Sequence, residues 1–159
     1  MTLQDLGNIG EFVGAIGVIA TLVYLALQIR QNTRSTRTAM YQATTRDMFE
    51  AADLMARDAD LNSIWFEGIR DFDSLSREKK RRFASYMFSL LRRYDNAHHQ
   101  TNAGMIDGDW WAGISETLEY TISNPGVQSW WKEGRALFRP DFREFIDQMI
   151  SGIERPGAS

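Results

Sequence analysis

The sequence predicts an all-α protein: a single N-terminal transmembrane helix that continues into a long cytoplasmic helix, followed by a small helical bundle. An uncharged apolar run lies near the N-terminus, apolar residues elsewhere recur at spacings of three and four, and no stretch alternates as a half-buried strand would. The 159 residues carry a net charge of −3, no cysteine and two histidines. These counts exclude disulfide frameworks, thiolate chemistry and multi-histidine metal centres, and they argue against a nucleic-acid partner.

The uncharged run covers Phe12 to Ile29, and extending it to Ile9 gives 21 residues, of which 15 are apolar. As a helix it would span about 31 Å, which matches the hydrocarbon core of a bilayer. Asp5 precedes the run without any basic residue, and the run is too long for a secretory signal. An uncleaved anchor is therefore favoured over a cleaved leader, with residues 1–8 as a short outer tail and 9–29 as the transmembrane helix.

Flanking charges predict the orientation of this helix. Asp5 and Glu11 precede the uncharged stretch from Phe12 to Ile29, whereas Arg30, Arg34 and Arg37 follow it and the next acidic residue is far along the chain. The positive-inside rule then places the C-terminal side in the cytoplasm and the N-terminus outside. The three arginines are expected to contact anionic headgroups, which makes membrane lipid a predicted partner.

Small and uncharged polar residues recur at spacings of three and four along one face of this helix. Glycines on such a face allow close backbone approach, which is a main source of helix association in lipid, and residues 10–14 have the GxxxG form. A parallel homo-oligomer is therefore predicted. We call this set the seam; it comprises Gly7, Gly10, Gly14, Gly17, Thr21, Tyr24, Gln28 and Gln31, and continues through Ser35, Thr38, Gln42 and Thr45.

Glu11 has two interpretations. The favoured one places it at the membrane interface, where it contributes to orientation. The alternative is a ring of Glu11 carboxylates at the mouth of a small homo-oligomeric cation channel, with Thr21, Gln28 and Gln31 along the path.

The chain beyond the membrane is expected to be helical throughout. No glycine or proline interrupts residues 30–58, so one helix is predicted from about Leu6 to Arg57. Residues 59–153 are expected to form the helical bundle, with the five tryptophans as core anchors, and 154–159 a tail. The first two predicted helices of this bundle are Leu61–Asp71 and Ser76–Ala103, the second with Ser76 as its N-cap and Gly104 as its terminator. A third helix is capped by Asp109 and runs to Ile122. The fourth is Asn124–Phe138, with Pro125 in its first turn, and the fifth begins at Pro140.

One cluster has the spacing of a chemical site. Asp95 has His98 and His99 three and four residues further along a predicted helix, which suits a metal site or an acid–base pair. A second such element is missing, so an ordinary helix-surface or intersubunit pair is favoured, and a metal-dependent enzyme is kept as a third hypothesis. No phosphate-binding glycine loop occurs, and no catalytic residue, metal or cofactor is predicted.

Three segments carry a resemblance to a known family: Leu22–Thr33, Pro125–Trp131 and Phe138–Phe142. The chain resembles a family of small, uncharacterised bacterial proteins that have one N-terminal membrane helix and a helical cytoplasmic part. The resemblance implies location in the bacterial inner membrane and implies no activity or catalytic residue. The expected function is a scaffold or accessory subunit that associates with itself and with other membrane-complex subunits.

Overall fold

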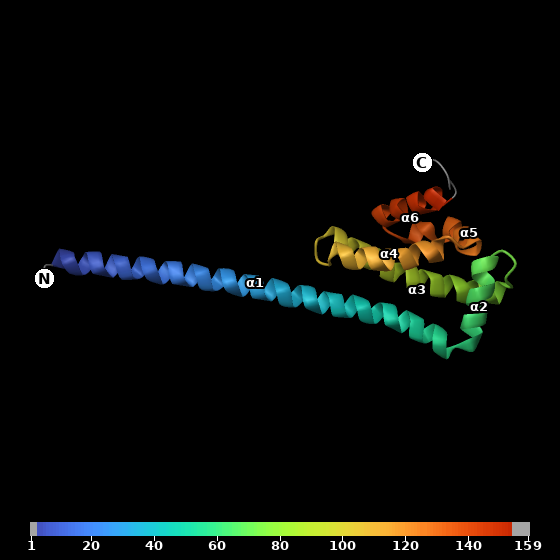
Figure 1. Cartoon of the computed structure of the whole chain (residues 1–159), viewed down its shortest axis with the longest axis horizontal. Helices are drawn as coiled ribbons and strands as arrows, with labels where there is room; N and C mark the ends of the chain where they lie inside the picture. Colours follow the sequence, from blue (N-terminus) through green and yellow to red (C-terminus); the bar gives the residue numbers. More distant parts are fainter. Residues whose placement is uncertain (1–2, 154–159) are drawn as a thin grey trace. The chain divides into compact units, whose positions relative to one another are not determined.

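The computed structural model describes residues 3–153, and the side chains of residues 11, 12 and 14–153, and confirms the all-α class. No strand occurs among these residues (Figure 1). The elements are α1 (Leu3–Arg57), α2 (Ala59–Arg70), α3 (Arg77–Asn102), α4 (Gly108–Ile122), α5 (Pro125–Gly134), the 3₁₀ turn η1 (Arg135–Leu137) and α6 (Pro140–Ile153).

The chain divides into two units at residues 39 and 40, within α1. The helix begins at Leu3, so much of the predicted outer tail 1–8 is helical, and the predicted tail 154–159 lies outside the described residues. The C-terminal unit includes the last turns of α1 because Thr44 and Ala51 are buried against the helical domain. The compact unit therefore starts before the predicted boundary at 58/59.

Local side-chain chemistry accounts for the starts of three helices. The Asp58 carboxylate accepts a hydrogen bond from the Leu61 amide at 2.8 Å and caps α2. Ser76 caps α3, as predicted. The prediction that Asp109 caps α4 is wrong: Asp107 is the cap, and its carboxylate accepts from the Asp109 amide at 2.8 Å.

Helix α3 ends at a glycine, as predicted. Gly104 has a φ of +67°, a conformation that residues with a Cβ rarely adopt. Its amide donates to the Thr101 carbonyl at 2.9 Å, and the Met105 amide donates to the Gln100 carbonyl at 2.9 Å. This pair of bonds is a Schellman motif, which satisfies carbonyls that the end of the helix leaves free.

Asn124 precedes Pro125 at the start of α5 but does not cap that helix with its side chain. Its side-chain amide instead donates to the carbonyls of Tyr120 and Thr121 at 2.8 and 3.1 Å, at the end of α4. The helix predicted to reach Phe138 ends at Gly134, and η1 carries the chain onward.

Helix α3 is central to the core of the C-terminal unit and contacts α2, α4, α5 and α6. Trp130 and Trp131 are buried, which confirms them as core anchors, and the Trp131 indole N–H donates to Asp147 at 2.9 Å. The other three tryptophans are only partly buried. The largest fully buried side chains include Phe83, Met87, Leu91, Leu118, Ile122, Trp131, Phe142 and Ile146.

Two glycines allow close packing around α2: Gly126 lets α5 approach it at backbone distance, and Gly68 makes room for the Phe83 ring of α3. A Cβ on Gly126 would overlap the Gly68 carbonyl oxygen and lie 2.9 Å from the Phe72 amide nitrogen. A Cβ on Gly68 would overlap the Phe83 ring. Backbone atoms move less easily than the end of a side chain, so Gly126 is the stricter of the two requirements.

We expect Gly126→Ala to lower the free energy of unfolding of the full chain by about 2 kcal/mol or more, because α2 and α5 must separate to admit the methyl group. Gly113→Ala is the matched control: it lies inside α4 with open space around it, and should raise stability by about 0.5 to 1 kcal/mol. Urea unfolding in detergent, followed by tryptophan fluorescence, measures both. Equal effects of the two variants would contradict the close approach.

Candidate functional site

The first half of α1 presents an apolar surface that no other part of the described chain covers. Between Phe12 and Ile29, ten large apolar side chains are 46% to 67% exposed, and they occur on all sides of the helix. By length and composition, this is one helix that is able to cross a membrane, and its most apolar stretch has no buried residue. The core helix of a soluble domain passes the same test of length and composition but is mostly buried, whereas this stretch is exposed.

The seam residues of this half are exposed as well. A Cβ on Gly14 or Gly17 would meet no atom within 4 Å, so both glycines leave room for another chain. The Thr21 hydroxyl donates to the Gly17 carbonyl at 2.8 Å, so it offers only its lone pairs to a neighbour. Tyr24, Gln28 and Gln31 are also exposed, whereas the surroundings of Gly7 and Gly10 lie outside the described side chains.

Exposed charges lie on either side of the apolar surface. Glu11 precedes it, and Arg30, Arg34 and Arg37 follow it. Among the described residues none of the four takes part in an ion pair. The three arginine side chains are therefore exposed at one end of the apolar surface and Glu11 at the other.

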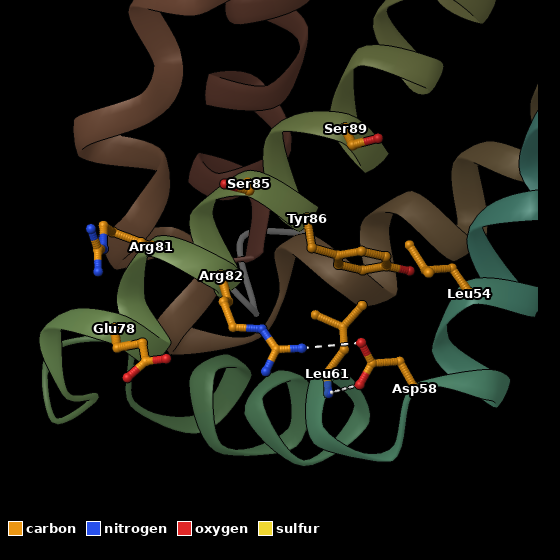
Figure 2. Close-up of a pocket in the computed structure, with 9 residues that line it drawn as sticks. All are labelled: Leu54, Asp58, Leu61, Glu78, Arg81, Arg82, Ser85, Tyr86 and Ser89. Atoms are coloured by element: carbon orange, nitrogen blue, oxygen red, sulfur yellow. Dashed lines mark hydrogen bonds and ion pairs between the residues drawn. The ribbon is translucent and has the colours of Figure 1, made fainter.

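A groove of about 630 Å³ lies in the C-terminal unit where the end of α1 meets α2 and α3 (Figure 2). Its walls combine apolar side chains with charged ones from α3 and from Asp58, which lies between α1 and α2. The lining residues are Leu54, Asp58, Leu61, Glu78, Arg81, Arg82, Ser85, Tyr86 and Ser89.

The polar groups at the floor of this groove hold helices together. Figure 2 shows the Arg82 guanidinium facing the Asp58 carboxylate, at 3.0 Å, while the same carboxylate caps α2. The Tyr86 hydroxyl donates to the Ala51 carbonyl at 3.2 Å, and burial raises the pKa of Tyr86. Ser85 and Ser89 have no imidazole beside them among the lining residues. The groove therefore joins α1 and α2 to α3 and holds no nucleophile paired with a base.

Sequence reasoning missed this groove because its lining comes from three elements whose packing is set by distant contacts. The sequence signals that could have located it are the capping residue Asp58 and the basic residues at the start of α3, since opposite charges at helix ends often pair.

The structure separates the members of the predicted Asp95/His98/His99 cluster. Asp95 and His98 are 1% and 9% exposed, whereas His99 is exposed to solvent. The interpretation of Asp95 and His98 as a surface pair is therefore wrong, because aromatic residues of α4 and α6 cover this side of α3. Within the described part of the chain, no group of three histidine, aspartate or glutamate residues is arranged to hold a metal ion.

Different neighbours hold the two buried residues. Arg92 pairs with the Asp95 carboxylate at 2.9 Å, and also donates to the Leu137 carbonyl at 2.8 Å. The His98 ring stacks on Phe145 with centroids 4.9 Å apart. It also lies against Trp111 and Phe142, and its Nε2 is 3.3 Å from the Asn102 amide nitrogen. His98 thus acts as part of an aromatic cluster joining α3, α4 and α6.

Comparisons with family models, with curated proteins and with solved structures found no match to this chain. The resemblance to a family of small bacterial membrane proteins stays a prediction.

The buried position of His98 predicts a pH-dependent stability. Burial lowers the pKa of His98 below its ordinary value. The negative charges of Asp141 and Asp95 act to raise this pKa, and the nearby His99 acts to lower it, but the effect of burial is the largest. The folded chain then keeps His98 neutral while the unfolded chain takes up a proton below about pH 6.5. Stability is complete above that pH and falls as the pH drops toward the lower, folded-state pKa, by at most about 1.4 kcal/mol per pH unit.

Urea unfolding from about pH 7.5 down to about pH 5.5 measures this loss, and His98→Phe should flatten it because the phenyl ring fits the aromatic surroundings without titrating. His99→Gln is the control and should keep most of the wild-type pH dependence, since His99 is exposed and its effect is the smallest of the four on the pKa of His98. Parallel profiles for the wild-type protein and His98→Phe would show that His98 does not cause the dependence.

Proposed function

We propose that the chain is a single-pass inner-membrane protein that associates with itself through the seam and carries its helical domain in the cytoplasm. The domain serves as a scaffold or accessory subunit of a membrane assembly. The observation that carries the proposal is the uncovered apolar surface of α1 between Phe12 and Ile29. Such a surface is unstable in water, at about 25 cal/mol per Å² of apolar area, and it is stable in lipid.

The orientation in this proposal follows from Arg30, Arg34 and Arg37. Their exposed side chains lie directly beyond the apolar residues, where the cytoplasmic leaflet supplies anionic headgroups. Each basic residue near such a surface contributes about 1 kcal/mol of attraction.

Self-association through the seam is supported by the open space at Gly14 and Gly17. Lipid provides no hydrophobic drive for pairing helices, so close backbone contact at small residues is what stabilises a helix pair there. The scaffold role is supported by the state of the polar groups in the domain, since Asp58, Arg82 and Arg92 are each held in contacts that fix one part of the chain against another.

Membrane insertion and orientation are tested together with single cysteines, because the native chain has none. In spheroplasts, a membrane-impermeant maleimide should label Thr2→Cys directly and Glu119→Cys, an exposed position on α4, only after the membrane is permeabilised. Loss of the Thr2→Cys residue from the mature chain would indicate a cleaved leader. Labelling of Glu119→Cys in intact spheroplasts would contradict the orientation.

Association through the seam is tested by replacing its glycines with a large residue. Gly14→Leu with Gly17→Leu should convert the detergent-extracted oligomer to monomer, because the new side chains hold the helix backbones apart. Ala26→Leu, which enlarges a small residue off the seam, should leave the oligomer intact. Light scattering of the purified full chain measures the mass, and a glycine variant of unchanged mass would refute association through the seam.

A further inference from the structure

A second uncovered stripe lies on α1, within the C-terminal unit. Phe49 is 69% exposed although it lies in a helix that packs against the folded domain. Ala52 and Ala56, three and seven residues further on, are exposed on the same face. We call these three residues the Phe49 stripe.

The domain uses a different face of the same helix. Thr44 and Ala51 are buried and Met48 is half-buried, with the Thr44 hydroxyl 3.4 Å from the Gln100 amide oxygen of α3 and the Ala51 carbonyl bonded to Tyr86. Thr44, Met48 and Ala51 each lie one position before a residue of the other face, namely Thr45, Phe49 and Ala52. One position corresponds to a rotation of about 100° around the helix. The Phe49 stripe therefore remains outside the contacts that fold the domain.

The Phe49 stripe continues the seam in register. The seam residues Gln42 and Thr45 are followed at spacings of four, three and four by Phe49, Ala52 and Ala56. The same alternation of three and four thus runs from Gly7 to Ala56. A repeat of this kind, averaging 3.5 residues, keeps one face of a helix toward a neighbour in a left-handed bundle.

Charge is excluded from this face even where charges are frequent. Eight of the 28 residues from Arg30 to Arg57 are charged, and none of the eight lies at a seam position or in the Phe49 stripe. In a parallel symmetric bundle each such position lies beside its own copy, so a charged residue there would repel itself. A partner of different sequence would tolerate charges by complementing them, so the exclusion favours a second copy of this chain.

We propose that the Phe49 stripe is a cytoplasmic interface between copies of this chain, continuing the association that begins at the seam. Phe49 supplies the large apolar contact, and Ala52 and Ala56 allow the two helices to approach each other around it. This inference rests on the proposed self-association and adds to it a second contact region outside the membrane.

Disulfide cross-linking of the full chain tests the interface directly, because the protein has no cysteine of its own. Phe49→Cys and Ala52→Cys should form covalent dimers on the order of tenfold faster than Asp47→Cys and Glu50→Cys, since a disulfide requires Cα atoms within about 7 Å. The control positions are exposed on the same helix and point away from the stripe. Thr21→Cys reports on the seam in the same preparation.

The outcomes separate the two proposals. Rapid dimers from Thr21→Cys with Phe49→Cys and Ala52→Cys no faster than the controls would overturn the cytoplasmic interface and leave the seam standing. No dimers from any of the five variants would overturn both.

Phe49→Lys provides an independent measurement. It should lower the oligomer mass or raise the monomer fraction severalfold in dilute detergent, because lysines would face one another across the interface. Phe66→Lys is the matched control, since Phe66 is also an exposed phenylalanine, at 51%, but lies on α2. Both variants should keep the wild-type helix content, and an equal effect of the two on mass would overturn the assignment.

Discussion

The first half of α1 places a constraint on everything that follows it: its apolar side chains are exposed and contribute nothing to a core. The helical domain therefore has to bury enough surface from residues 40–153 alone. It does so with aromatic residues on α3, α5 and α6, among them Phe83, Trp131 and Phe142, which are each at most 2% exposed. Large rings bury more area per ordered residue than aliphatic side chains do, which suits a small domain.

The last turns of α1 pack against the helical domain on one face and leave another face exposed. One face meets α3 through Thr44 and Ala51, and the face one residue further round carries Phe49 without cover. A helix is able to do both because residues one apart differ by about 100° in direction. Thr45 is half-buried with its hydroxyl oxygen covered, whereas Gln42, Phe49, Ala52 and Ala56 are exposed, so the seam and the domain contact share Thr45 and otherwise use different side chains.

The features predicted from sequence are those set within a few residues. Ser76 as a cap and Gly104 as a terminator depend on local hydrogen bonds, so they were predicted correctly. Asp107 and Asp109 are both suitable caps two residues apart, and the choice between them depends on how the chain leaves α3. The burial of His98 and the groove beside Asp58 depend on which helices meet, and a single sequence does not specify those contacts.

The polar chemistry of the domain is used to fix one part of the chain against another. Arg82 with Asp58 joins α3 to the start of α2, Arg92 joins α3 to the Leu137 carbonyl, and the Trp131 indole joins α5 to α6 through Asp147. Three uncovered surfaces on α1 carry no charge: the apolar stretch from Phe12 to Ile29, the seam and the Phe49 stripe. Surfaces of that composition bind through shape and buried area, and the proposed function assigns lipid to the apolar stretch and another helix to the seam and the Phe49 stripe.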